Sequence, residues 1–215
     1  MELHYRKKIC AACREEIKLT FEMVNNGDIL YRKNSYYHKE CFVEMIKNRM
    51  AELGGHSVHW QEVLNNLDEY AKDARQRIEN YHYREALNLY LLARYPDVGK
   101  FSSQFWLIIE SIGNGIYKTK RCKPIDCKTL LDMWKYFEKK LDKLYEYNKS
   151  NGKNMDSEVR TRYDLSCIIA HYSEYTKAKE REQQAKIIAS QIKEEEKIDY
   201  TRIPKPKREK KRTFD

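Results

Sequence analysis

The sequence predicts a mainly α protein that begins with a small β-hairpin-plus-helix unit and ends in a long helix. The chain of 215 residues contains only 7 glycines and 4 prolines, which leaves few turns and favours long helices. Hydrophobic residues alternate near the N-terminus and recur every three or four positions afterwards. We therefore expect a small unit over residues 1–55, a helical domain over residues 56–200, and a basic tail over residues 201–215 that is disordered when free.

Within the first unit, the pattern predicts a hairpin followed by a helix. Residues 17–24 alternate between apolar and polar side chains, which is the period of a strand. The stretch 25-NNGD-28 favours a tight turn, because Asn and Gly tolerate positive φ, and the return strand covers residues 29–33. A helix then follows over residues 38–53 and ends at the glycine pair 54–55.

Later segments show the period of amphipathic helices. Pro96 is expected to end the predicted helix 84–95. Asp126 and Ser157 are placed to cap the predicted helices 128–147 and 157–200. An unbroken final helix would be about 60 Å long at the standard rise of about 1.5 Å per residue. The predicted helices cover residues 57–83, 84–95, 101–112, 128–147 and 157–200, with an extended or looped basic segment over residues 116–124.

Two chelating pairs in the first unit predict a structural metal site. Cys10 and Cys13 form a C-x2-C pair, and His38 and Cys41 form an H-x2-C pair one helical turn apart. Three thiolates and one imidazole are the closed tetrahedral shell typical of structural Zn²⁺. With all four positions filled by protein, no place is left for an activated water, so zinc would be a fold element here. The alternative is that these are unrelated buried side chains.

This order of pair, hairpin and helix-borne pair resembles a treble-clef zinc finger. It is similar to the first module of LIM domains and to the poly(ADP-ribose) polymerase-type finger, over residues 10–50 only. The former resemblance implies protein binding and the latter implies binding to DNA ends. The chain also resembles small zinc-finger proteins of Gram-positive phages and prophages, in which such a finger precedes a helical domain.

The net charge of +9 favours a polyanionic partner, with nucleic acid first and DNA as the expected kind. Cations near the metal pairs, in the basic segment and in the tail are candidates for phosphate contacts. The alternative is that the excess positive charge only keeps the protein soluble. The candidate contacts are Lys7, Lys8, Arg14, Lys39, Lys118, Lys120, Arg121, Lys123, Lys205, Lys207, Arg208, Lys210, Lys211 and Arg212.

Two weaker patterns remain open. Cys122, Cys127, Cys167 and His171 could form a second metal site, but C-x4-C is an unusual spacing and buried thiols are the better interpretation. The predicted helices 84–95 and 101–112 could form a helix-turn-helix. The second of them is very apolar, which favours an ordinary helical hairpin.

The sequence as a whole predicts a zinc-finger DNA-binding protein that acts in replication, repair or transcription control. The rival interpretation is a protein-interaction adaptor that uses a LIM-like finger and the long C-terminal helix. Catalytic motifs such as a phosphate loop or a nucleophile elbow are missing, so we do not expect an enzyme. Without an apolar segment of membrane-spanning length, a cytosolic location is expected.

Overall fold

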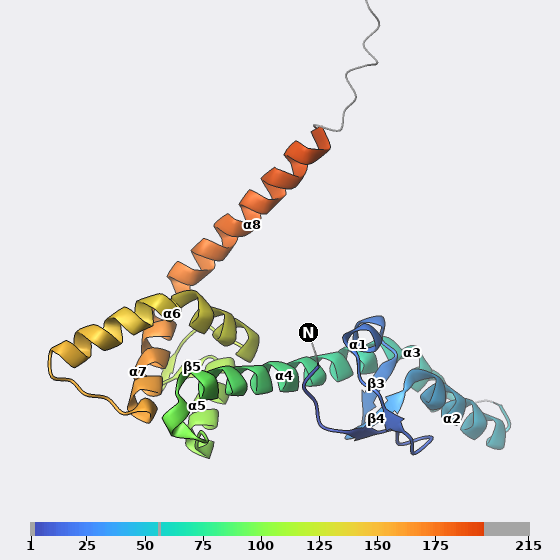
Figure 1. Cartoon of the computed structure of the whole chain (residues 1–215). Coiled ribbons are helices and arrows are strands. Elements are labelled where there is room, and N and C mark those ends of the chain that lie inside the picture. Colours follow the sequence, from blue (N-terminus) through green and yellow to red (C-terminus); the bar gives the residue numbers. More distant parts are fainter. Residues whose placement is uncertain (1–2, 56, 196–215) are drawn as a thin grey trace, which may run out of the picture. The chain divides into compact units, whose positions relative to one another are not determined.

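The computed structural model describes residues 3–55 and 57–195. The chain divides into two compact units, Met1–Ile168 and Ile169–Asp215, and each is considered by itself. Helices dominate and small two-stranded sheets occur in the first unit, which confirms the predicted mainly α class (Figure 1). Within the described ranges, no helix combines the length and apolar character that crossing a membrane requires.

The N-terminal part, here called the finger, contains two small antiparallel sheets and two helices. The two strands of the first sheet flank the Cys10 and Cys13 segment. The second sheet is a hairpin whose turn residues, Lys33 and Asn34, both have positive φ. The elements in order are β1 (Lys8–Ile9), β2 (Glu16–Ile17), α1 (Phe21–Asn26), β3 (Ile29–Arg32), β4 (Ser35–His38) and α2 (Lys39–Glu52).

The hairpin is formed by β3 and β4, whereas the alternation predicted a hairpin of strands 17–24 and 29–33. Only Ile17 of the predicted strand 17–24 is in a strand, and residues 21–26 form α1 instead. The Thr20 hydroxyl accepts a hydrogen bond from the Met23 N–H at 3.1 Å, and Gly27 ends the helix with a φ of 77°. A helix cap at each end therefore overrides the alternating pattern, and 25-NNGD-28 is a helix end instead of a hairpin turn.

The remaining helices match the predicted ones with two corrections. Residues 84–94 belong to one 28-residue helix that begins at Leu67, and the break in the 57–95 region falls at Asn66. The final helix is interrupted at His171 and is capped by Asp156, whose Oδ1 accepts from the Val159 N–H at 2.8 Å. The elements are α3 (Val58–Asn65), α4 (Leu67–Arg94), η1 (Pro96–Val98), α5 (Ser103–Gly113), β5 (Ile116–Tyr117), β6 (Lys120–Arg121), α6 (Cys127–Ser150), α7 (Ser157–Ala170) and α8 (Tyr172–Glu195).

Helix α4 completes the core of the finger. Ala74 and Ile78, from the first half of α4, are buried together with Ile17, Leu19 and Ile29 of the finger. A second buried cluster joins β3 and α2 to Val63 of α3. The finger therefore does not close its core alone, and α4 connects it to the helices that follow (Figure 1).

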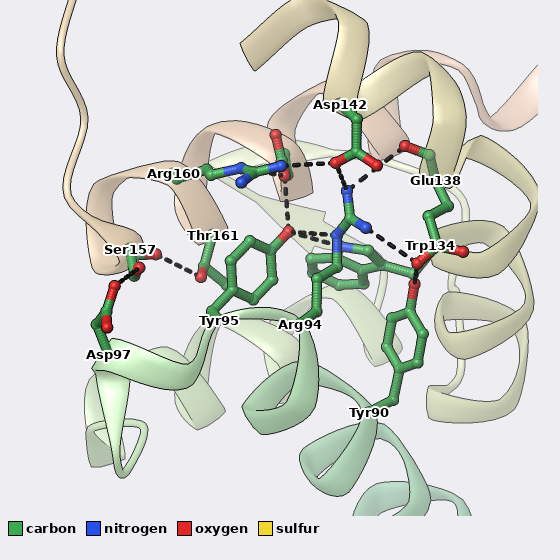
Figure 2. Close-up of polar contacts among 11 residues, drawn as sticks. Tyr90, Arg94, Tyr95, Asp97, Trp134, Glu138, Asp142, Ser157, Arg160 and Thr161 are labelled. Carbon is green, nitrogen blue, oxygen red and sulfur yellow. Dashed lines mark hydrogen bonds and ion pairs between the residues drawn. The ribbon is translucent and has the colours of Figure 1, made fainter. Parts of the chain in front are cut away.

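The second half of α4 packs with α5, α6 and α7 in what we call the helical bundle. Buried leucines and aromatic side chains fill it, and a few polar groups, Asp164 and the Tyr95 hydroxyl among them, lie between these apolar side chains. The Tyr95 hydroxyl donates to Asp164 Oδ2 at 2.6 Å and accepts from Trp134 Nε1 at 3.1 Å and from Arg94 Nε at 3.2 Å. Figure 2 shows Arg94 and Tyr95 at the end of α4 together with Trp134 of α6 and Arg160 of α7. Burial raises the pKa of the Asp164 carboxyl.

Candidate metal centre

The first chelating pair lies in the tight turn between β1 and β2. The Cys10 N–H donates to the Glu15 carbonyl at 2.8 Å, and the Arg14 N–H donates back to the Cys10 carbonyl at 2.9 Å. Arg14 has a φ of 67°, in the left-handed region that a non-glycine residue seldom adopts. These bonds fold the turn so that Cys10 and Cys13 can face the same point.

The second pair lies where β4 becomes α2. His38 is the last residue of β4 and precedes α2, and Cys41 follows in the first turn of that helix. The two pairs are tied together by the backbone, since the Ala11 N–H donates to the Tyr36 carbonyl at 2.9 Å. The β3–β4 hairpin therefore delivers the second pair to the first, as a hairpin between two chelating pairs is expected to do.

The four side chains form a cluster that can hold a metal ion. Their candidate ligand atoms all lie within 4.8 Å of one another. His38 Nδ1 lies 3.5 Å from Cys13 Sγ and 3.7 Å from Cys41 Sγ. In a tetrahedron with metal–sulfur bonds of about 2.3 Å and metal–nitrogen bonds of about 2.0 Å, the edges are about 3.5–3.8 Å. The predicted ligand set is thus brought together, the two sulfur–nitrogen distances match the edges of such a tetrahedron, and Nδ1 is the nitrogen that faces the cluster.

The thiols of the cluster differ in how easily they ionise. Burial opposes ionisation of Cys10, but backbone N–H groups of Cys13, His38 and Ala12 outweigh it and lower its pKa to about 7. Burial raises the pKa of Cys41 to about 11, and the neighbouring Cys13 and Cys10 add to that shift. Three thiolates this close repel one another, and a divalent cation between them would relieve that repulsion.

The second set of possible ligands is not brought together. Across residues 3–55 and 57–195, the Cys10, Cys13, His38 and Cys41 cluster is the only group of three or more side chains placed to share a metal ion. Cys122, Cys127 and Cys167 are half-buried free thiols, and burial raises the pKa of Cys127 to about 11. His171 instead lies 3.0 Å from Glu174.

The candidate helix-turn-helix has the apolar second helix that the sequence indicated. Phe105, Ile109 and Ile112 of α5 are buried in the bundle. Their apolar face is thus already used for packing, whereas a recognition helix presents polar side chains to base edges. This packing favours the ordinary helical hairpin over a helix-turn-helix in which α5 reads bases.

Of the predicted phosphate contacts in the finger, Lys8 lies over an aromatic ring. Its ammonium lies 4.9 Å from the centre of the Tyr36 ring. Lys7 instead forms an ion pair with Glu16 at 2.7 Å. Arg14 is exposed at the metal turn, and Lys39 is the first residue of α2.

The predicted basic segment forms the β5–β6 hairpin. Lys118 occupies its turn with a φ of 47°, and its ammonium lies 3.2 Å from the Ser166 hydroxyl. Lys120, Arg121 and Lys123 are exposed. The tail candidates lie outside the described residues, namely Lys205, Lys207, Arg208, Lys210, Lys211 and Arg212.

Two further cations lie over tyrosine rings in this part of the molecule, and no local sequence pattern indicates them. The Arg77 guanidinium, from α4, lies 4.1 Å from the centre of the Tyr31 ring, and Arg32 lies 5.6 Å from the Tyr70 ring. Tyr31 pairs across the hairpin with Tyr36. Arg77 is 36 positions beyond the last metal ligand, so only the packing of α4 on β3 could reveal it.

Comparisons of the chain with protein-family models, with curated proteins and with solved structures found no match. The assignment of a function therefore depends on the site itself.

Proposed function

We propose that the chain is a zinc-dependent DNA-binding protein whose treble-clef finger carries the main DNA contacts. The observation that supports this most is a set of three cations, each held over a tyrosine ring, in the finger and on the helix that packs against it. Lys8, Arg32 and Arg77 come from β1, β3 and α4, and each lies over a tyrosine ring of the finger or of α4. We call Lys8, Arg32 and Arg77 the finger cations.

Zinc is the metal that this ligand set favours. Soft thiolates with one imidazole select Zn²⁺ among the common divalent ions, and a closed four-ligand shell is the structural form of that site. Three thiolates around Zn²⁺ leave a net charge of about −1 by counting charges. Nearby cations offset this charge, so that the finger can approach a phosphate backbone.

The finger cations are available to phosphate. Within residues 3–55 and 57–195, none of the three forms an ion pair with a carboxylate. A cation held over an aromatic ring has a restricted position, so less side-chain entropy is lost when a phosphate binds. Such contacts bind the DNA backbone without reading its sequence.

Two further groups of cations extend the proposal. The β5–β6 hairpin presents Lys118, Lys120 and Arg121 on a short two-stranded ribbon. The predicted tail cations would add contacts through counterion release, which requires no fixed structure. In this view the hairpin and the tail raise affinity, and the finger sets the position.

The test is DNA binding by the zinc-loaded full chain. We would measure fluorescence anisotropy with a labelled duplex and with its single strand, at several salt concentrations. Replacing Lys8, Arg32 and Arg77 together by Gln should weaken binding about 10- to 100-fold. Each lost phosphate contact should also reduce the slope of log K against log salt by about 0.9 for a duplex.

The control removes the same charge elsewhere. A triple Gln variant at Arg162, Lys179 and Lys186 takes away three exposed cations that are already paired with glutamates. It should bind DNA nearly as the parent does. Equal losses in both triple variants would reduce the effect to net charge, and no binding at low salt would refute the proposal and favour the adaptor interpretation.

A further inference from the structure

A pocket in the first unit lies between α4, α5 and the start of α6. Its volume is about 520 Å³, within the range of about 300–1,000 Å³ that is usual for small-molecule sites. The lining includes Tyr83 and Arg84 of α4, Trp106 of α5 and Lys128 of α6. None of these belongs to the metal cluster, so the pocket needs its own explanation.

Two aromatic rings in the pocket wall each carry a cation. The Arg84 guanidinium lies 5.0 Å from the centre of the Trp106 ring, and the Lys128 ammonium lies 5.2 Å from the centre of the Tyr83 ring. A guanidinium on an indole is a flat, positively charged surface. Planar heterocycles such as nucleobases stack well on surfaces of this kind.

The pocket cations are free for an anion, while most of its acids are engaged. Neither Arg84 nor Lys128 forms an ion pair with a carboxylate in the described parts of the chain. Glu79 pairs with Arg75 at 3.1 Å, and the Asp126 carboxylate accepts from the Thr129 N–H at 2.7 Å as the cap of α6. The remaining lining includes the amides of Asn80 and Asn114, which can both donate and accept hydrogen bonds, and the carboxylate of Glu110.

We propose that this pocket binds one nucleotide. Its base would stack on the Arg84 and Trp106 pair, with side-chain amides at the base edge. Its phosphate would face Lys128 and Arg84. A stacked base and a paired phosphate together match the two kinds of group that the wall presents, whereas an apolar ligand would give neither cation an anionic partner.

The nucleotide could be free or part of a strand. The positions of two arginines along α4 are compatible with a strand. Arg77 of the finger and Arg84 of the pocket are seven residues apart, which places them two turns apart on nearly the same face of α4. The separation along the helix axis is about 10 Å. A strand held by the finger cations could therefore reach the pocket with an unpaired nucleotide. This strand-borne case depends on the proposed function, and the free-nucleotide case does not.

The three tryptophans of the chain give a direct readout. We would record the indole N–H signals of the zinc-loaded ¹⁵N-labelled protein by NMR, and assign the signal of Trp106 with a Trp106→Phe variant. Adenosine monophosphate and a short single-stranded oligonucleotide would be titrated separately. Each should shift the Trp106 signal saturably, whereas the signals of Trp60 in α3 and Trp134 in the bundle core should stay in place.

Two variants make the result specific. Arg84→Gln should weaken nucleotide binding at least 10-fold without changing the Trp134 signal, and the control Arg162→Gln should leave binding unchanged. Equal affinity for the mononucleotide and the oligonucleotide supports a free nucleotide. Tighter oligonucleotide binding that is lost in the triple finger variant supports a strand.

The two proposals can fail separately. If neither probe shifts the Trp106 signal at millimolar concentration, the pocket proposal is wrong even where the finger binds duplex. If adenosine monophosphate shifts it while the finger variants leave duplex binding unchanged, the DNA-binding face is wrong and the pocket stands.

Discussion

The finger and the helical bundle are held together by different means, although α4 passes through both. The finger contains only short strands and two helices, and it draws Ala74 and Ile78 of α4 into its core. Its two chelating pairs bring together four ligand atoms, three of them thiol sulfurs that repel one another once ionised. The bundle instead buries many large side chains around one tyrosine hydroxyl that joins three helices. The comparison teaches that the finger should depend on a metal and the bundle should not.

The largest expected effect is the loss of one metal ligand. Cys13→Ser should abolish stoichiometric zinc binding and unfold the finger, because in small metal domains metal binding and folding are one equilibrium. Zinc content by mass spectrometry and thermal melting by circular dichroism would measure this. Cys122→Ser, at a half-buried cysteine outside the cluster, is the control and should retain the metal. Equal zinc content in the two variants would exclude the metal centre.

In the bundle, the largest effect is expected at Tyr95. Tyr95→Phe removes the hydroxyl that Asp164, Trp134 and Arg94 share, and leaves their polar atoms buried without that partner. Each such group costs about 1–3 kcal/mol, so a loss of about 3 kcal/mol is expected in urea unfolding. Tyr147→Phe, at an exposed tyrosine of α6, should change stability by less than about 0.5 kcal/mol. A similar small change at Tyr95 would contradict its role.

A smaller effect distinguishes helix α1 from the strand that the alternation predicted. Thr20→Ala removes the hydroxyl that caps α1 and should cost about 1 kcal/mol in urea unfolding. Thr20→Ser keeps the hydroxyl and should be nearly neutral. If Thr20 lay in a strand, the alanine and serine variants would instead differ little.

The smallest effect is a pH dependence at His82. Its side chain is fully buried, and its Nδ1 accepts from the His4 N–H at 3.0 Å, which requires the neutral ring. Burial, with a contribution from His4, lowers its pKa below 6.5. Because the unfolded chain takes up a proton more readily, stability should be present above about pH 6.5 and fall as the pH decreases.

Urea unfolding at about pH 7.5 and pH 5.5, on either side of that ordinary value, would measure the effect. His82→Phe should reduce the loss of stability on acidification, and His59→Gln, at an exposed histidine of α3, should not. An equal loss in the parent and the His82→Phe protein would assign the pH dependence to other groups, such as the metal ligands.

The metal ligands could be predicted from the sequence because both chelating pairs are local. Each pair is fixed by its own turn or helix start, and so its spacing survives in the chain itself. The helical character after residue 56 was also predictable from its period, and α5 and α6 begin within two residues of the predicted positions, but the breaks at Asn66 and His171 were missed. These features depend on neighbours in the sequence.

The features that were missed depend on longer-range packing or on competing local bonds. Alternation at residues 17–24 pointed to a strand, but the Thr20 cap and Gly27 favoured a helix. The contact between Tyr95 and Asp164 spans 69 positions, and the contact between Arg77 and Tyr31 joins α4 to the finger. Neither pair has a local pattern, because such contacts exist only once the helices have packed.

The most direct test of the central claim is hydrogen exchange of the full chain, followed by mass spectrometry, with zinc and with excess chelator. Chelation should remove protection from residues 8–52 of the finger, while the second half of α4 and α6 should stay protected. Unchanged protection of the finger, in a protein that releases no zinc, would contradict the claim that a metal holds the finger together.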